Sequence, residues 1–475
     1  MLYFFALFFC RLYLVSPTFS IEPLYPVNAD NMIFVYYTDK PILSGGKHML
    51  ERINGCIWNS GLLFLLLFTG VIITVRTGFF QIRGIPHIAR NIGRSLKGGG
   101  GLSQWRVCTS ALAASMGTGN IAGVIAAIYI GGAGAVFWMW VSAFFGMILT
   151  YSENVLSMKY RRRNSDGSFT GGAFAYLRFG LGSGGLAVLY GVLCIMASLG
   201  MGNMTQSSTA ADAVKTAFAV PPLVTGIVIA AALGFTVLGG IKGIGRVTGV
   251  LLPFAAFGYM LLALIVIFVN AENIPAAFSE IFSGAFGLEE AAGGAVGTAV
   301  SAGLRHGVFS NEAGLGSSAL IHSSAEDDDP YLQGMWSVFE VFLDTMVCCT
   351  LTALVVLCTD ADIVYGTKPA ADAFAHVLGR FSEPAVAVMT VLFAFCTMLG
   401  WCCCGETAVR CTFSGKRAVS VYRWIFCLCA VFGAAGALSD IWTLSDIANG
   451  LMAIPNLLAL LILARHIKTP SAHKN

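Results

Sequence analysis

Charge is scarce in this sequence. Asp, Glu, Lys and Arg make up 11% of the 475 residues, whereas hydrophobic residues make up 56%. A soluble domain carries roughly 25% charged and 45–50% apolar residues. The mean hydropathy of +0.76 points the same way, and at ~20 residues per crossing the chain is long enough for about ten crossings of a membrane. The composition therefore predicts an all-α polytopic membrane protein, with the lipid bilayer as a partner.

Basic residues are also too few and too scattered for a nucleic-acid-binding surface. The formal net charge is only +3, and Lys and Arg gather neither on one face nor in one tail. A nucleic-acid partner is therefore excluded.

The motifs of enzymes and metalloproteins are missing as well. The 14 cysteines lie mostly in apolar runs such as 348–349 and 402–404, without even spacing or accompanying histidines; we interpret them as packing residues. Two Gly-x-Gly-x-x-x-Gly segments, at 117–123 and 243–249, depart by one residue from the dinucleotide fingerprint and follow no predicted strand. The sequence contains no Walker motif, His-Glu-x-x-His motif or nucleophile elbow. We predict no enzymatic activity and no cofactor.

Long apolar runs are what the sequence does contain. Residues 1–48 form an extension that is either signal-like or not translated, because Arg11 interrupts its apolar start and Met49 offers a second start. Residues 49–104 hold an extra N-terminal helix and a basic linker. In all, we predict eleven spans: 57–76, 105–129, 133–158, 184–214, 222–241, 247–270, 293–318, 331–358, 384–409, 418–437 and 441–465.

Lys and Arg recur in alternate connections between these spans, as the positive-inside rule requires of loops on a shared cytoplasmic side. The connection 271–292 has neither residue, and the acidic segment 323–331 is the one exception. We therefore expect the N-terminus outside and the tail 466–475 in the cytoplasm of a bacterial cell, with the protein in its inner membrane. The residues that carry this prediction are Arg76, Arg83, Arg90, Arg94, Lys97, Lys159, Arg161, Arg162, Arg163, Lys242, Arg246, Arg410, Lys416, Arg417, Arg465 and Lys468.

The second predicted span is interrupted by glycines. In SMGTGNIAG (115–123), Gly117, Gly119 and Gly123 flank two polar residues, Thr118 and Asn120. One interpretation is close packing of helices through small residues. The other is a helix that breaks in mid-membrane, which is tolerated only against protein or a water-filled cavity.

A counterpart in the seventh predicted span favours the break. In GLRHGVFSNEAGLGSS (303–318), glycines surround a polar group made of Ser310, Asn311 and Glu312. When the first of the eleven spans is set aside, the remaining ten divide into two repeats of five, 105–270 and 293–465. An interrupted span begins each repeat. An odd number of spans per repeat inverts one repeat relative to the other, and paired broken helices in inverted repeats indicate the binding site of a transporter. Each break exposes backbone N–H groups at the end of one helix half and C=O groups at the end of the other. The N–H groups attract a carboxylate, and the C=O groups attract a cation.

Five segments of the chain resemble the alanine/glycine:cation symporter family. The resemblance runs from about residue 49 to about residue 465, nearly the whole chain without the N-terminal extension. The five segments read ALAASMGTGNIAGVIAAIYIGGAGAVFWMW, GMGNMTQSSTAADAV, GGIKGIGRV, GVFSNEAGLGSSALIHSSA and LGWCCCGE. The resemblance implies a leucine-transporter fold with a 5+5 inverted repeat after one extra helix. It also implies sodium-coupled uptake of small neutral amino acids, namely alanine and glycine, by alternating access.

The resemblance further implies a substrate site. The first break would hold the carboxylate, Gln206 would reach the substrate from the side, and Phe309 would wall the side-chain pocket. Trp401, four residues after Thr397 and on the same helical face, would close over a small substrate. The sequence does not decide between L- and D-alanine as that substrate. The full set is Thr118, Gly119, Asn120, Gln206, Phe309, Ser310, Asn311, Thr397 and Trp401.

A sodium site implied by the resemblance lies between the first break and the ninth span, near Ser115, Met116, Gly119, Cys396 and Thr397. Family members usually have Ser-Thr where this chain has Cys396-Thr397. A thiol is a poor ligand for a hard cation. The family's GWSYYGE also becomes GWCCCGE, which removes two aromatic residues behind Trp401.

Glu312 is the remaining candidate, because an ionisable residue at membrane depth is functional by default. It would either couple transport to an ion or act structurally, as the ion-pair partner of Arg305 or a cap for broken-helix N–H groups. An alternative function is proton-coupled symport with Glu312 or His306 titrating. A channel is an alternative from another class, although no filter motif is present. We expect a monomer.

Overall fold

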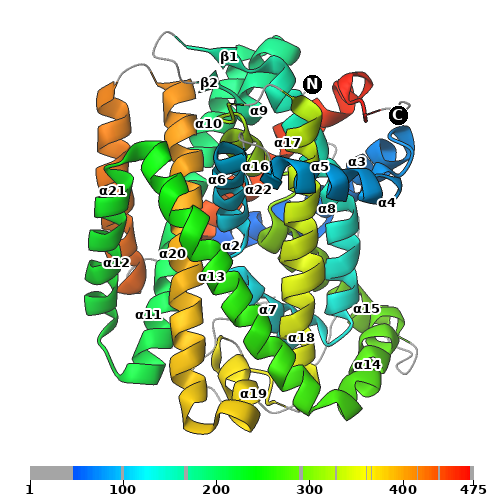
Figure 1. Cartoon of the computed structure of the whole chain (residues 1–475), viewed down its shortest axis with the longest axis vertical. Helices are drawn as coiled ribbons and strands as arrows, with labels where there is room; N and C mark the ends of the chain where they lie inside the picture. Colours follow the sequence, from blue (N-terminus) through cyan, green and yellow to red (C-terminus); the bar gives the residue numbers. More distant parts are fainter. Residues whose placement is uncertain are drawn as a thin grey trace.

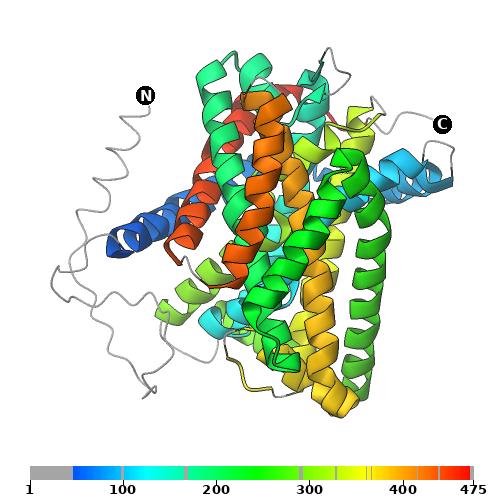
Figure 2. The ribbon, with the colours of Figure 1, turned by 90° about the vertical axis from the view of Figure 1, so that its left-hand side faces the viewer.

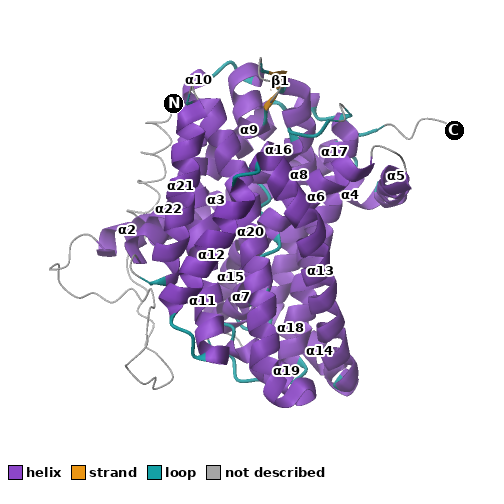
Figure 3. Ribbon diagram, turned by 60° about the vertical axis from the view of Figure 1, so that its left-hand side comes forward, coloured by secondary structure: helices purple, strands orange, loops and turns teal. Residues whose placement is uncertain are grey.

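The computed structural model describes residues 47–97, 101–164, 169–287, 293–326, 329–359, 361–364, 366–413, 416–436 and 439–470. Apart from residues 47 and 48, the predicted extension 1–48 lies outside them. Within these residues the protein is a bundle of helices that lie along one axis (Figures 1 and 2). The only strands in this part of the chain are β1 (Arg162–Arg163) and β2 (Phe169–Thr170), a short antiparallel pair at one end of the bundle (Figure 3).

The N-terminal segment lies before the two predicted repeats and holds several helices. Its apolar core is α3, in which only Arg76 is charged. The amphipathic helix α5 follows near the end of the bundle that carries β1 (Figure 1). The elements are α2 (Lys47–Cys56), the π-helical turn η1 (Ile57–Gly61), α3 (Leu62–Arg76), α4 (Phe80–Arg83) and α5 (Ile85–Lys97).

Helices of the first predicted repeat include a pair separated by a short 3-10 turn and a long helix with a π-helical stretch. They are α6 (Gly101–Ser115), η2 (Thr118–Asn120), α7 (Ala122–Gly131), α8 (Ala135–Tyr160), α9 (Gly172–Ala175), η3 (Tyr176–Gly180), α10 (Gly184–Leu199), η4 (Gly200–Met204), α11 (Thr205–Phe218), α12 (Pro222–Val237) and α13 (Gly240–Val269).

The second predicted repeat also starts with a helix pair separated by a break. Two further helices lie in its connections: α14, before the repeat, and α19, both at the end of the bundle opposite β1 (Figure 1). The elements are η5 (Ala271–Asn273), α14 (Ile274–Phe286), α15 (Gly293–Asn311), α16 (Ser317–His322), α17 (Pro330–Val341), η6 (Phe342–Cys349), α18 (Thr350–Leu357), α19 (Lys368–Leu378), η7 (Gly379–Phe381), α20 (Ser382–Thr412), α21 (Lys416–Ala434), α22 (Ser439–Ile462) and η8 (Ala464–His466).

Seven helices of the described residues are long and apolar enough to cross a membrane, and three apolar helices are shorter. Large apolar side chains face outward, among them Phe268, which is 85% exposed, and Phe235, which is 81% exposed. Side chains of this kind suit a lipid surface rather than water. The protein is thus a multi-pass helical membrane protein, as its composition predicts.

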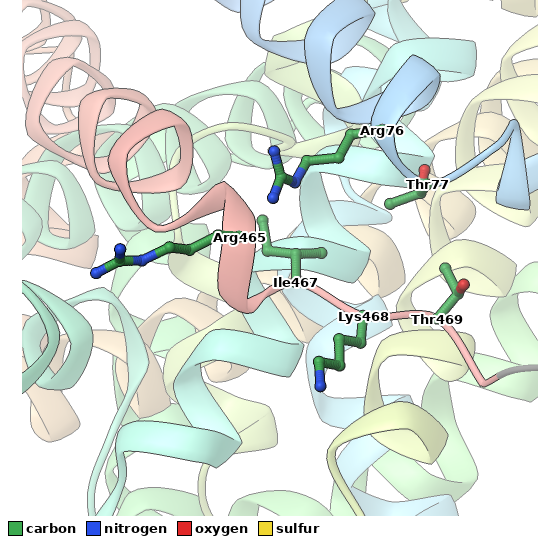
Figure 4. A pocket seen from close by; sticks show the side chains of 6 residues that line it. All are labelled: Arg76, Thr77, Arg465, Ile467, Lys468 and Thr469. Atoms are coloured by element: carbon green, nitrogen blue, oxygen red, sulfur yellow. The ribbon is translucent and has the colours of Figure 1, made fainter.

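Basic residues far apart in sequence meet at the end of the bundle that carries β1. A shallow cavity of about 430 Å³ is lined by the end of α3 and by η8 with the segment after it (Figure 4). Its cationic side chains are Arg76, Arg465 and Lys468. Two of the basic segments that the sequence analysis assigned to one side of the membrane, those after the first and the last predicted spans, therefore lie together here.

Candidate functional site

The first break lies where the glycines predict it. Helix α6 ends at Ser115, a single 3-10 turn spans Thr118–Asn120, and α7 begins at Ala122. A Cβ atom on Gly117 would lie less than 3.0 Å from Thr397 Oγ1 and 3.1 Å from Gln206 Oε1. Glycine is therefore required at residue 117, because α20 and α11 approach the backbone of the break too closely for a side chain.

The second break separates α15 from α16 over residues 312–316. Its backbone is left-handed at Glu312 (φ 55°), Gly314 (φ 85°) and Gly316 (φ 77°), a conformation that glycine adopts without strain. Gly307 instead lies inside α15, where a Cβ would meet Ser142 Cβ of α8 at 2.6 Å. The glycines at 314 and 316 thus form the break, whereas Gly307 serves helix packing.

Gln206 reaches the first break from the side. Its Oε1 accepts hydrogen bonds from the backbone N–H of Thr118 at 3.2 Å and from Thr118 Oγ1 at 2.9 Å. Within the break, the N–H of Gly117 donates to Asn120 Oδ1 at 2.9 Å. The π-helical turn η4 directly precedes the helix that carries Gln206, and such turns are frequent at functional sites.

Asp344 links the two breaks. Its carboxylate accepts hydrogen bonds from Asn120 Nδ2 at 2.7 Å, from Ser310 Oγ at 2.7 Å and from Thr345 Oγ1 at 2.8 Å. The side chain is fully buried and lies in the π-helical stretch η6. The sequence analysis gave Asp344 no role; the one signal was an ionisable residue inside an apolar span.

Glu312 is bonded to the ninth predicted span. Trp401 Nε1 donates to its Oε1 at 2.5 Å, and Ser317 Oγ, at the start of α16, donates to Oε2 at 2.6 Å. Of the alternatives for Glu312, the ion pair with Arg305 is wrong, because Arg305 Nη2 contacts Asp446 Oδ2 at 2.7 Å instead. Glu312 therefore joins the second break to the Trp401 ring, and Asn311 Oδ1 rather than Glu312 accepts the N–H of Ala313, at 3.0 Å.

Trp401 itself is fully buried. Its ring lies against Gly202 of η4, where a Cβ would come closer than 3.0 Å to three of its atoms. The ring is thus held on one side by a glycine and at its N–H by Glu312. Trp401 therefore lies between the π-helical turn η4, in the fourth predicted span, and the second break.

Some of the residues proposed for the sodium site lie close to one another. Thr397 Oγ1 donates to the carbonyl of Met116 at 3.1 Å, so α20 does contact the C-terminal end of α6. Ser115 Oγ is bonded within its own helix, to the carbonyl of Leu112 at 3.2 Å. Cys396 is fully buried among apolar side chains that include Met116. Carbonyl and hydroxyl oxygens are available here, and the thiol adds no oxygen ligand.

The two breaks also touch directly. A Cβ on Gly119 would be 3.8 Å from Ser310 Cα, and Asn120 Nδ2 lies 3.5 Å from Ser310 Oγ. Asn311 Nδ2 donates to Thr345 Oγ1 of η6 at 3.3 Å. Phe309 stacks on Trp58 at 4.9 Å between ring centroids. His306, the other proton candidate, lies next to Phe309, with the two ring centroids 6.5 Å apart. The structure thus brings the predicted substrate residues of both breaks, α11 and α20 close together, and all of them are buried except Gly119 and Phe309, which are half-buried.

Two interrupted helices that meet in the middle of a multi-pass bundle, and whose broken ends face polar side chains, define a secondary transporter. Solved transporters share the fold. The crystal structure of MhsT in complex with L-phenylalanine has a TM-score of 0.57 at 14% identity, over 75% of this chain and 88% of MhsT. A Na⁺-coupled sialic acid symporter has a TM-score of 0.50 at 12% identity, over 88% and 98% of the two chains. This likeness confirms the predicted leucine-transporter-like fold.

Sequence comparison gives the family. Residues 44–472 match the model of the sodium:alanine symporter family. The sodium/alanine symporter AgcS of Methanococcus maripaludis is 40% identical over 88% of this chain and 94% of its own length. The probable sodium/glutamine symporter GlnT of Bacillus subtilis is 33% identical over 89% of each chain. The chain belongs to the sodium:alanine symporter family, whose members are transporters and not enzymes.

Proposed function

We propose that the protein takes up small neutral amino acids, alanine and glycine first, together with sodium by alternating access. The observation that carries the proposal is the buried group formed by the two helix breaks with Gln206 and Trp401. The family match supports sodium-coupled transport, and the most similar of the relatives described above is called a sodium/alanine symporter.

The amino acid would lie between the two breaks. Thr118, Gly119 and Asn120 would offer N–H and side-chain groups to its carboxylate, and the carbonyl end of α15 with Ser310 and Asn311 would face its ammonium group. Gln206, which bonds to the first break, would fix the orientation. Phe309, Thr397 and Trp401 would bound the side-chain pocket.

Sodium would be bound at the C-terminal end of α6. The carbonyls of Ser115 and Met116 with the Thr397 hydroxyl supply oxygen ligands of the kind that hard cations prefer. Cys396 would leave this site with one oxygen fewer than the Ser-Thr pair of the family. We expect sodium affinity to be weaker for that reason.

Topology follows from the same proposal. The seven long helices, together with α3, α12 and the two interrupted pairs α6–α7 and α15–α16, would make eleven crossings. Residues 105–270 and 293–465 would be the two inverted repeats. The basic end of the bundle, with Arg76 and Arg465, would face the cytoplasm of a bacterial cell. We propose that one chain is the working unit.

The test is uptake of labelled alanine and glycine into proteoliposomes under an imposed sodium, lithium or proton gradient, with D-alanine and leucine as competitors. Sodium-dependent uptake that D-alanine blocks and leucine does not would support the proposal. No uptake under any gradient would contradict it.

Proton-coupled symport is the second candidate. The carboxylates of Glu312 and Asp344 are buried and, among the described residues, lie in no ion pair. A buried carboxylate without a counter-ion favours binding of a proton or a metal cation. A relative from Bacillus subtilis, 33% identical, is called a putative sodium/proton-dependent alanine carrier protein. Uptake driven by a pH gradient without sodium would select this candidate.

A further inference from the structure

Five side chains join the N-terminal segment to two helices of the repeats. We call them the Trp58 cluster: Asn54 of α2, Trp58 of η1, Arg305 and Phe309 of α15, and Asp446 of α22. The extra N-terminal helix therefore contributes residues beside the candidate site and is more than a peripheral span.

Asp446 is the centre of the cluster. Its Oδ2 accepts from Asn54 Nδ2 at 2.7 Å and from Arg305 Nη2 at 2.7 Å, and its backbone carbonyl accepts from Trp58 Nε1 at 3.2 Å. Gly450, one turn further along α22, allows close approach, because a Cβ there would lie 3.1 Å from Trp58 Nε1. One residue of α22 thus holds both the N-terminal segment and the guanidinium of α15.

The aromatic rings of the cluster are stacked. The Trp58 and Phe309 centroids are 4.9 Å apart with an interplanar angle of 29°, and the Arg305 guanidinium lies 5.7 Å from each ring. Trp58 is 0% exposed. Since its ring is packed and its N–H is bonded, Trp58 is a rigid support for the half-buried ring of Phe309.

We propose that Trp58 is a positioning residue that sets the size limit of the substrate side chain by fixing the ring of Phe309. The inference rests on the proposed function, in which Phe309 walls the side-chain pocket. Phe309 directly precedes Ser310, which bonds to Asp344 at the junction of the two breaks. Under the proposed function, in which the Phe309 ring walls the side-chain pocket, a shift of this ring changes the space beside the bound amino acid.

Small changes in this space have large effects on selectivity. A stacked aromatic pair is stabilised beyond the area that it buries, and a single methylene in an apolar pocket changes discrimination about 10–200-fold. Loss of the Trp58 ring frees one face of Phe309 and opens room next to it. Larger side chains then become acceptable, while alanine loses contacts.

The test compares uptake of alanine, 2-aminobutyrate and leucine by the wild type and three variants in proteoliposomes. Trp58→Ala removes the support and Trp58→Phe shortens it. Phe64→Ala is the matched control, because Phe64 lies on the adjacent helix α3 and is 70% exposed. KM and maximal rate are measured for each substrate, since a purely structural defect lowers all rates alike.

For each substrate we divide the maximal uptake rate by KM, and we compare the value for leucine with that for alanine. We expect Trp58→Ala to raise this leucine-to-alanine ratio about tenfold or more. Trp58→Phe should give a smaller rise, and Phe64→Ala none. If Trp58→Ala does not yield folded protein, the same ratio is measured for Trp58→Phe and for a fourth variant, Asn54→Ala, which removes the bond from Asn54 to Asp446. A raised ratio in these two variants would then support the inference. Equal ratios in all folded variants would overturn the inference while normal wild-type uptake keeps the proposed function. Absence of sodium-dependent alanine uptake by the wild type would instead refute the proposed function.

Discussion

Gly117→Ala is the substitution that tests the geometry of the first break most sharply. The new Cβ would lie less than 3.0 Å from Thr397 Oγ1 and 3.1 Å from Gln206 Oε1 and Thr397 Cβ. Thr397 is β-branched and lies in the interior of α20, so it has few alternative positions. Overpacking of this kind costs about 1–3 kcal/mol. We expect Gly117→Ala to destabilise the protein by that amount and to lower alanine uptake.

The measurement is the unfolding midpoint of the purified protein in detergent, together with alanine uptake. Gly123→Ala is the control, because Gly123 lies inside α7, and the nearest atom to a Cβ there is His306 Nδ1 at 4.0 Å. It should be neutral or stabilising by up to about 1 kcal/mol. The double variant Gly117→Ala/Thr397→Ala should recover part of the lost stability. Equal midpoints for Gly117→Ala and Gly123→Ala would refute the reasoning.

Three further substitutions test the other contacts. Trp401→Phe removes the N–H that bonds to Glu312. A hydrogen bond to a charged partner contributes about 1.5–3 kcal/mol, so the KM for alanine should rise at least tenfold. An unchanged KM would exclude a role of this bond in substrate binding. Asp344→Asn replaces one acceptor oxygen by an NH2 group, so at least one of the hydrogen bonds from Asn120, Ser310 and Thr345 to this side chain is lost. Sodium-driven uptake should fall strongly while the protein stays folded by circular dichroism; wild-type uptake would contradict the link between the breaks. Cys396→Ser adds an oxygen ligand, so the sodium concentration for half-maximal uptake should fall, and an unchanged value would place Cys396 outside the sodium site.

The positions of both breaks are predictable from the sequence because they depend on local chemistry. Glycines next to polar residues inside an apolar run leave close packing or a break open at 115–123, and the similar pattern at 303–318 favours the break that lies at 116–121. The resemblance also anticipates that Gln206 approaches the first break. Local composition, however, cannot separate Gly314, which forms the second break, from Gly307, which packs inside α15.

Contacts between distant parts of the chain are what the sequence does not determine. Arg305 is seven residues from Glu312, and proximity in sequence makes their pairing plausible, yet its partner is Asp446, 141 residues away. Asp344 gives the same lesson, since nothing in its neighbourhood in sequence names Asn120 as a partner. The amphipathic α5 and the connecting helices α14 and α19 were not predicted, because connections were interpreted only by their charge.

The central claim is that one buried group at the two helix breaks binds the amino acid and sodium together. Linkage then requires that sodium raises the affinity for alanine and that alanine raises the affinity for sodium by the same factor. The direct measurement is calorimetric titration of the purified protein with alanine at several sodium concentrations, and with sodium at several alanine concentrations. We predict equal factors above about five in both directions. Alanine binding with an affinity that does not depend on sodium would contradict the account.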